Sequence, residues 1–439
     1  MKKKSVRYFM QKVSRASIAL ESLMLALLVA IMTLPRSYTA LKLSLLMAII
    51  LLATPQIRMV IGFMKKVDVI GFYCSVAILG CLWTIVGLIN GGIIPSLIDY
   101  FRLYVGWSLA YLIMVSLIYI AGGLYIFHRA AVLSAILISL INIAGVLDVM
   151  YGFYLIPESV SKSLAMNIGF HEGYIQITSS NIGSLFFLVT YLIAIYVRKD
   201  TQLFRNPYTH IALVLGLICA ALSGRRALWV TIALQPLVLL VAFIFAGGRN
   251  RFRFSFYSIF LYGLTIIFLV SAVSGLLDID FTGTLEHLYQ AFSDEDVRYA
   301  QRQGLINGFF DHLIIGSGFG GNIFSPDDER AGTYESTFHQ ILFNFGIVGV
   351  SLILFIFFRY LRICLVNTKA LYPLDGVSFC LIIGLLSFLI GAYSNPYLGS
   401  FDFLLYIAIL PLIAGVKSAA KFSTNKEASK YSNSTRATD

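Results

Sequence analysis

The chain has 439 residues, of which 58% are hydrophobic and only 13% are charged, and its mean hydropathy is +0.83. Soluble domains carry about a quarter charged residues, so this composition excludes a water-soluble globular protein. The net charge of +11 does not indicate nucleic-acid binding, because the Lys and Arg residues lie mostly between apolar runs. The expected solvent is a lipid bilayer.

Apolar runs long enough to cross a bilayer recur along the whole chain. A helix of about 20 apolar residues spans the hydrocarbon core. The sequence therefore predicts an all-α integral membrane protein of about 12 transmembrane helices, near residues 18–34, 39–54, 69–89, 105–127, 130–150, 179–197, 208–222, 227–246, 254–275, 339–358, 374–394 and 401–416. Residues 1–416 form one polytopic domain in this prediction, and the basic start of the chain is a cytoplasmic flank of a retained first span.

The distribution of positive charge predicts the orientation, since cytoplasmic segments are enriched in Lys and Arg. With both termini inside, 24 of the 33 cations lie in inside segments. The other nine lie outside or within the second span; they are Arg36, Lys42, Arg102, Lys162, Arg225, Arg226, Arg298, Arg302 and Arg330. We therefore expect both termini in the cytoplasm.

Two outer loops are long enough to carry function. Residues 151–178 form one, and residues 276–338, between the ninth and tenth spans, form the other. Loops beyond about 12–15 residues are usually functional or structured, so the active site is expected on the outer face. The tail at 417–439 is rich in Lys, Ser, Thr and Asn, which predicts a disordered cytoplasmic end.

The first candidate site is the short turn between the seventh and eighth spans, Ser223-Gly224-Arg225-Arg226. An arginine carries a permanent charge and a planar fork that matches phosphate oxygens. The alternative is that both arginines extend toward lipid headgroups.

The second candidate lies in the large loop. Ser293-Asp294-Glu295-Asp296 predicts a helix start, and the helix continues from Val297 to about Leu313. Arg298 and Arg302 then share a face and could bind a diphosphate together, or they could pair with the acidic residues of that helix start. Arg330, later in the same loop, is a further candidate binding residue.

A glycine-rich turn, Gly316-Ser317-Gly318-Phe319-Gly320-Gly321, follows this helix. It matches a dinucleotide-binding pattern formally, but that pattern needs a preceding strand in a cytoplasmic βαβ unit. Gly316 and Gly318 instead predict a turn that brings backbone close to a ligand, or one that only redirects the chain.

Four other ionisable groups stand out. Glu335 and His339 enter the tenth span at the outer face and either could act as a general base, although Glu335 could equally be an acid favoured at a helix start. Glu21 and Asp148, in or at the ends of spans, are functional candidates because charges are rare in lipid. No histidine pair has metal-ligand spacing and the five cysteines are scattered, so neither a metal nor another cofactor is expected.

Three patterns resemble the O-antigen polymerase and ligase family of polytopic membrane glycan enzymes. Ser223-Gly224-Arg225-Arg226-Ala227-Leu228 resembles the family's Thr/Ser-Gly-Ser-Arg turn, with Arg226 on the family arginine. Arg298 followed by His312-Leu313-Ile314-Ile315-Gly316-Ser317-Gly318 resembles an arginine, a helix and His-Pro-Leu-Leu-Gly-x-Gly. The third pattern resembles the family's Gln-Leu-Leu-x-Glu-x-Gly-x-x-Gly and is the segment Gln340-Ile341-Leu342-Phe343-Asn344-Phe345-Gly346-Ile347-Val348-Gly349. Ligases begin that segment with His-Asn, where this chain has Glu335-Ser336, and His339 is out of register.

The resemblance implies a metal-independent glycosyltransferase on the outer face of the bacterial inner membrane. Its donor and acceptor would be polyprenyl-diphosphate-linked oligosaccharides, and a chain-length regulator protein would be a further partner. The missing ligase histidine favours polymerase over ligase. A polysaccharide flippase is the alternative of another class, but the candidate groups concentrate outside the bundle and no internal repeat is evident.

Overall fold

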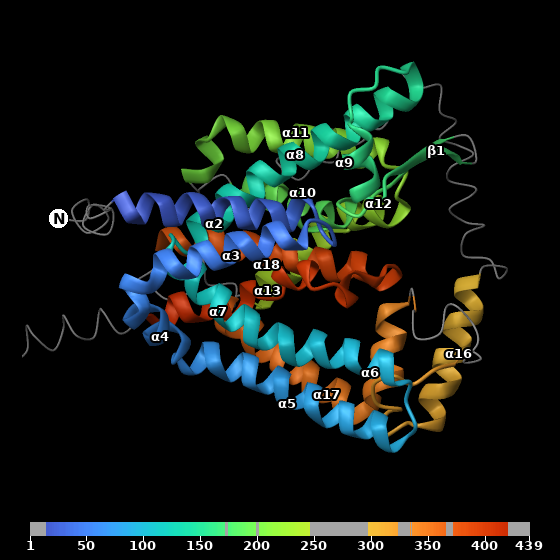
Figure 1. Cartoon of the computed structure of the whole chain (residues 1–439). Coiled ribbons are helices and arrows are strands. Elements are labelled where there is room, and N and C mark those ends of the chain that lie inside the picture. The colour runs from blue at the N-terminus through green and yellow to red at the C-terminus, as the bar shows by residue number, and fades with distance from the viewer. Residues whose placement is uncertain are drawn as a thin grey trace, which may run out of the picture.

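The computed structural model describes residues 15–171, 174–198, 202–245, 297–323, 334, 336–365 and 372–419 (Figure 1). The first half consists of α2 (Arg15–Thr33), α3 (Thr39–Ala53), η1 (Thr54–Gln56), α4 (Ile57–Met64), α5 (Val67–Ile89), α6 (Ile94–Phe101), η2 (Arg102–Gly106), α7 (Trp107–Ile120), α8 (Leu124–Tyr151), α9 (Glu158–Ser163), β1 (Asn167–His171) and β2 (Tyr174–Thr178).

The second half is helical as well. It consists of α10 (Ile182–Arg198), η3 (Gln202–Arg205), α11 (Pro207–Leu222), α12 (Arg226–Ala233), α13 (Gln235–Phe245), α16 (Val297–Asp311), α17 (Thr337–Leu365), α18 (Tyr372–Gly391), η5 (Ala392–Ser394), η6 (Pro396–Gly399) and η7 (Asp402–Leu405), which opens the last apolar helical segment, Asp402–Ala419.

The helices have the length and composition of membrane spans. Six described helices can cross a bilayer, or seven if the bent pair α12–α13 counts as one span, and four further apolar helices are shorter. The helical membrane fold is therefore confirmed. The number of twelve spans and the orientation of the termini stay predictions, because the ninth predicted span and both chain ends lie outside the described residues.

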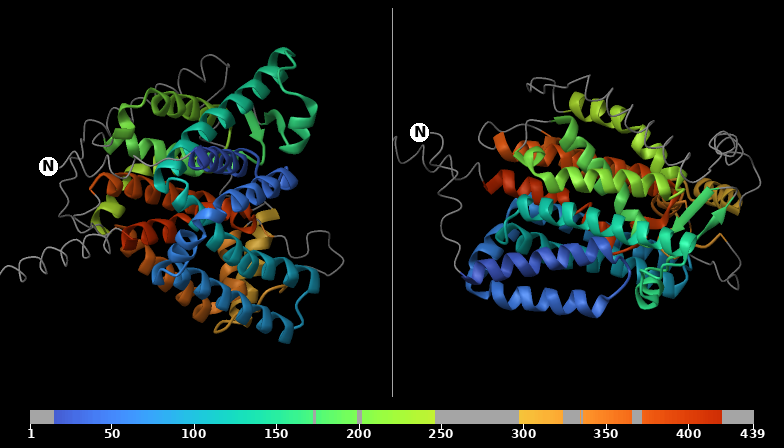
Figure 2. Two further views of the ribbon diagram at one scale, coloured as in Figure 1. Left: turned by 60° about the vertical axis from the view of Figure 1, so that its left-hand side comes forward. Right: turned by 90° about the horizontal axis from the view of Figure 1, so that it is seen from above.

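The long helices run side by side, and their connections divide between two ends of the bundle. The end opposite the N-terminus carries α9, the β1–β2 pair and α16, which runs across the direction of the other helices (Figures 1 and 2). The turns before α3 and before α12 lie at this same end, as does the segment between α18 and the last helical segment. We call it the loop end.

The centre of the bundle is α10, whose residues from Ile182 to Ile195 are all buried. A helix that is apolar on every side belongs inside a bundle. It packs against α18, α8 and α11. Gly391 makes the contact with α18 close, because a Cβ there would lie 2.0 Å from the Phe186 ring.

One part of the loop end is not helical: the predicted outer loop at 151–178 contains a short strand pair. β1 and β2 form an antiparallel pair with Ile168 opposite Ile177. In β2, Ile175 and Ile177 are buried and alternate with less buried residues. β2 therefore follows the two-residue period of a half-buried strand.

The two isolated acids of the spans have structural partners. Glu21 forms an ion pair with Arg129 of α8. Asp148 accepts hydrogen bonds from the backbone N–H groups of Leu155 and Ile156, the latter at 2.8 Å. These contacts give both acids partners within the protein. Their functional role stays a prediction.

Candidate functional site

The predicted arginine turn is present between α11 and α12. α11 ends at Leu222, Gly224 takes a φ of +60° that favours glycine, and Arg226 is the first residue of α12. The buried Ser223 hydroxyl donates to the Ala220 carbonyl and accepts from the Arg225 N–H. Both arginines are therefore fixed at the loop end, where each is partly buried.

Strand β2 holds Arg225 from one side. The Nε–H of Arg225 donates to the Ile177 carbonyl at 3.1 Å, and the Ile177 N–H donates back to the Ser223 carbonyl at 2.9 Å. Within the described part of the chain, the terminal nitrogens of Arg225 make no hydrogen bond. The guanidinium is thus positioned by its inner nitrogen.

Arg225 shares its surroundings with Tyr397 and Arg36. Burial raises the pKa of the Tyr397 hydroxyl to about 12, while the charges of Arg225 and Arg36 act in the opposite direction. Arg36, in the turn before α3, donates from its guanidinium to the Pro396 carbonyl at 3.2 Å. Arg36 and Arg225, which are far apart in the sequence, therefore lie near one phenol.

Asp402 completes this group. It accepts from the Arg36 N–H at 2.7 Å and forms an ion pair with Lys42 at 2.9 Å. Lys42 also donates to the Leu34 carbonyl at 2.7 Å. We call these five residues, Arg36, Lys42, Arg225, Tyr397 and Asp402, the Arg225 group. Three of them are cations and one is an acid, so the group carries a net positive charge.

Helix α16 brings the second predicted pair of arginines to the same end. It covers Val297–Asp311, close to the predicted 297–313. Buried Leu305 packs with Phe343 of α17, and Gly308 permits close contact, since a Cβ there would lie 2.6 Å from the Phe343 ring. The helical backbone places Arg298 one turn before Arg302; the Arg298 side chain lies outside the described residues.

His339 lies beside this helix, at the start of α17. The charge of Arg302 is within electrostatic range of its imidazole, and the ring centroid lies 5.8 Å from that of Tyr393. The Nδ1 atom is enclosed and has no hydrogen-bond partner among the described residues. We call Arg302, His339 and Tyr393 the His339 group.

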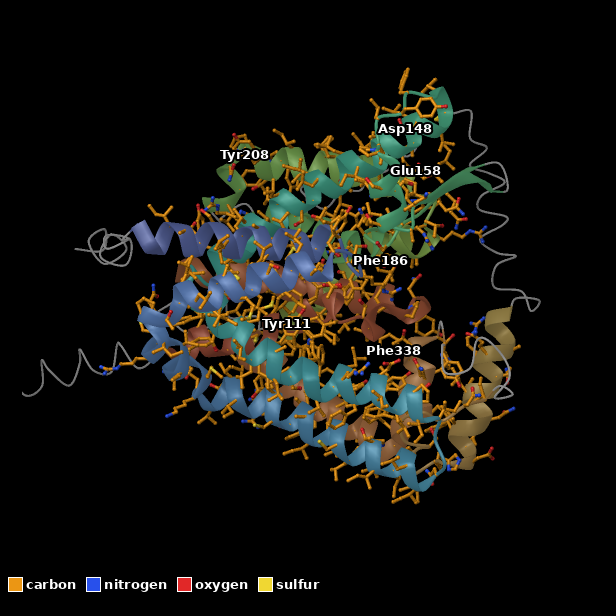
Figure 3. The ribbon with its side chains drawn as sticks, in the orientation of Figure 1. Tyr111, Asp148, Glu158, Phe186, Tyr208 and Phe338 are labelled. Carbon is orange, nitrogen blue, oxygen red and sulfur yellow. The ribbon has the colours of Figure 1, made fainter. Side chains whose placement is uncertain are left out.

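The segment after α18 joins the two groups. Tyr393 and Tyr397 lie four residues apart in it, and the Thr337 hydroxyl of α17 donates to the Asn395 carbonyl between them at 2.9 Å. Figure 3 marks a neighbour of each group: Phe338, stacked on Tyr393, and Phe186, which contacts Tyr397. The loop end thus presents two cationic groups along one short segment.

The glycine-rich turn has a role within the fold. Gly316 and Gly318 have φ values of +82° and +76°. The N–H of Gly316 donates to the His312 carbonyl, and that of Gly318 to the Asn344 carbonyl at 3.0 Å. A Cβ on either would lie within 2.3 Å of neighbouring backbone. The predicted close approach of backbone exists, but its partner is the protein's own helices.

Several predicted residues cannot be placed, and several placed residues were not predicted. Glu335 and Arg330 lie outside the described residues. Arg36, Lys42, Asp402, Tyr393 and Tyr397 were not assigned to any site. The pair of Lys42 and Asp402 could have been predicted, because each is a charged residue in an apolar run and a charged residue in lipid needs a partner of opposite charge. Within the described ranges, no three His, Cys, Asp or Glu residues lie close enough to hold a metal.

Comparison with known proteins bears on this end of the molecule. Residues 211–354 match the sequence model of the O-antigen ligase family, a range that contains the Arg225–Arg226 turn, α16 and the start of α17. No curated protein matches the chain. The match supports membership of this chain in the O-antigen polymerase and ligase family of membrane proteins.

Proposed function

We propose that this protein polymerises polyprenyl-diphosphate-linked oligosaccharide repeat units into O-antigen or a related surface polysaccharide. One observation carries the proposal: the segment that matches the family supplies Arg225, Arg226 and α16, and these lie at one end of an apolar helical bundle together with His339. A membrane-bound substrate with a diphosphate needs cations at the membrane surface, which this end provides.

In the proposed reaction, an acceptor hydroxyl of one repeat unit attacks the anomeric carbon of the growing chain. A glycosidic bond forms, the bond from that carbon to the diphosphate oxygen breaks, and the polyprenyl diphosphate leaves with the electron pair. The main requirement is to position this leaving group and neutralise its developing charge. Arg226 and Arg298 have this role in the proposal, and Arg225 and Arg302 assist.

The acceptor hydroxyl must lose its proton as it attacks. Glu335 and His339 are the proposed groups for accepting that proton or orienting the hydroxyl. Because Nδ1 of His339 is enclosed, an acceptor would meet the ring at Nε2. The proposed chemistry needs no metal.

The N–H groups of Gly316 and Gly318 already form hydrogen bonds within the protein, so these two residues are left out of the proposed substrate site. Arg330 stays in that site as a predicted binding residue.

The proposal includes a location. Twelve spans with both termini in the cytoplasm would place the loop end on the outer face of the bacterial inner membrane, where lipid-linked repeat units would be joined. The excess of Lys and Arg in the opposite segments supports this orientation. A chain-length regulator protein is a proposed partner at this face.

The related alternative is ligation of finished polymer to a lipid acceptor. Polymerase is favoured because Glu335-Ser336 stands where ligases of the family have His-Asn. The alternative of another class is a flippase. A flippase would be expected to hold its ionisable groups inside the bundle, whereas the Arg225 and His339 groups lie at its end.

A deletion host separates these functions by the glycan profile on a gel. Loss of a polymerase leaves surface lipid capped with a single repeat unit, loss of a ligase leaves polymer on the carrier, and loss of a flippase removes surface display. In the same host, we expect Arg226→Ala and Arg298→Ala to abolish polymer. The matched control is Arg102→Ala, whose side chain is 76% exposed in a surface ion pair. Full polymer length in both test variants would exclude the proposed roles.

A further inference from the structure

The turn between α2 and α3, at the loop end, holds Arg36 in an uncommon backbone conformation. Arg36 has a φ of +64°, and Tyr38, two residues later, has a φ of +53°. Residues other than glycine adopt such angles at an energetic cost, and they persist where surrounding contacts enforce them, most often at functional sites. Ser37 supplies such contacts, because its N–H donates to the Leu34 carbonyl at 3.2 Å and its hydroxyl donates to the Ser163 carbonyl.

Asp402 fixes Arg36 through the backbone and not through the guanidinium. One carboxylate oxygen of Asp402 accepts from the backbone N–H of Arg36 at 2.7 Å, and the other accepts from the Lys42 ammonium at 2.9 Å. The ion-pair partner of Asp402 is therefore Lys42. The guanidinium of Arg36 donates to an uncharged group, the Pro396 carbonyl, at 3.2 Å.

Arg36 and Arg225 differ from three other cations that the sequence places outside the cytoplasmic segments. Lys42, Arg102 and Lys162 each form an ion pair with an acidic residue. Within the described ranges, neither Arg36 nor Arg225 forms one. Two positive charges without an acidic partner attract an anion to this end of the molecule.

The two arginines have Tyr397 in common. Arg36 contacts the carbonyl of Pro396, the residue directly before Tyr397, and the charges of both Arg36 and Arg225 are within electrostatic range of the Tyr397 hydroxyl. The Tyr397 ring packs on Phe403, with the ring centroids 5.0 Å apart. Two guanidinium groups from turns that are far apart in the sequence therefore lie around one phenol whose ring is held by packing.

We propose that Arg36 is a substrate-binding residue that contacts, together with Arg225, the diphosphate of the lipid-linked glycan. The inference rests on the proposed function, and it adds a residue from outside the family-matched range 211–354. A planar guanidinium donates two parallel hydrogen bonds to phosphate oxygens. A diphosphate offers one phosphate group to each arginine, whereas a monophosphate offers only one in total. A phospholipid headgroup has the same phosphate chemistry, so the experiment must separate the two sources.

The test measures binding of farnesyl diphosphate and of farnesyl monophosphate to the purified full chain in phosphatidylcholine nanodiscs, by isothermal titration calorimetry. The first variant is Arg36→Asn, because asparagine adopts a positive φ more readily than arginine does. The bond to Asp402 comes from the backbone, so the substitution leaves it in place, and a melting curve checks the fold. Arg36→Lys keeps the charge without the planar fork. Arg102→Asn is the matched control, since it removes a cation from an exposed ion pair.

We expect the wild type to bind the diphosphate more tightly than the monophosphate. Arg36→Asn should weaken diphosphate binding about tenfold, the effect of losing one charge-assisted contact, and should weaken monophosphate binding much less. Arg36→Lys should fall between the two, and Arg102→Asn should leave both affinities unchanged. Unchanged diphosphate affinity in Arg36→Asn overturns the proposal. So does an equal loss for both ligands, because Arg36 would then contribute nothing to the second phosphate.

Native mass spectrometry of the same variants, purified with phosphatidylglycerol present, tests the headgroup source. Loss of bound phosphatidylglycerol in Arg36→Asn with unchanged diphosphate affinity would assign Arg36 to headgroups and overturn the proposal. The glycan profile of the deletion host tests the proposed function separately. Loss of polymer in that host, with full diphosphate affinity in Arg36→Asn, would reject the role of Arg36 and leave the function standing. A host that keeps its polymer would reject the function, whatever Arg36 binds.

Discussion

The ion pair between Lys42 and Asp402 gives a quantitative test of how the Arg225 group is held. The two side chains are 10% and 13% exposed, so the charges are largely removed from solvent. Removing one partner of a buried pair costs about 3–5 kcal/mol, because the other charge stays buried without compensation. Lys42 keeps its bond to the Leu34 carbonyl, which favours the lower end. We therefore expect Asp402→Asn to lower the free energy of unfolding by about 3 kcal/mol.

The measurement is reversible unfolding in mixed detergent micelles, followed by tryptophan fluorescence. Lys42→Met in the Asp402→Asn background removes the stranded charge and should recover at least half of the loss. The exposed pair of Lys162 and Glu158, with side chains 75% and 80% exposed, is the matched control; Glu158→Gln should cost about 0.5 kcal/mol or less. If Asp402→Asn costs no more than this control, the pair does not hold the group.

Three further predictions concern the loop end. Gly316→Ala should destabilise the protein more than Gly91→Ala in the same unfolding assay, because both have positive φ but only Gly316 has backbone within 2.3 Å; equal losses would refute the packing argument. Burial raises the pKa of Tyr397 to about 12, so its contribution to stability is complete below pH 10 and is lost as the pH rises from 10 to 12. The stability of the wild type relative to Tyr397→Phe should fall only in that window, and a flat difference up to pH 12 would contradict it. Arg225→Lys keeps the charge but loses the Nε–H donor to Ile177, so we expect shorter polymer on glycan gels, and unchanged length would show that charge alone suffices.

Local patterns predicted much of the helical architecture. Apolar runs marked the spans, and the Ser-Gly-Arg-Arg turn lies between two helices as expected, with Gly224 at a positive φ. The helix after Asp296 also has nearly the predicted bounds. These features depend on residues close together in the chain, and their physical causes can therefore be read from a short window of sequence.

Features that depend on distant residues were not predicted. Lys42 and Asp402 are 360 residues apart, and nothing local to either identifies the other as its partner. The contact between residues 313–318 and α17 is similar, because it depends on backbone hydrogen bonds between separate segments, such as that from the Ile347 N–H to the Leu313 carbonyl. The glycines indicated close backbone contact correctly, but their spacing does not specify whether a ligand or a helix fills that contact.

The bend between α12 and α13 has a consequence for the order in which the protein assembles. The pair bends by 48° at Leu234, and Pro236 cannot donate a backbone hydrogen bond there. Beside the bend, the fully buried Gln235 donates to the Thr190 carbonyl at 3.1 Å and accepts from the Ser387 hydroxyl at 2.8 Å.

During synthesis, Thr190 is already available when Gln235 emerges, but Ser387 follows 152 residues later. At a translation rate of 5–20 residues per second, Ser387 is synthesised about 8–30 s after Gln235, and the side-chain oxygen of Gln235 lacks this hydrogen-bond donor until then. An unpaired polar group in lipid is unfavourable. A chain that ends before α18 therefore lacks the Ser387 donor, and its Gln235 side-chain oxygen is unpaired. The incompletely synthesised bundle differs from the complete one in this respect.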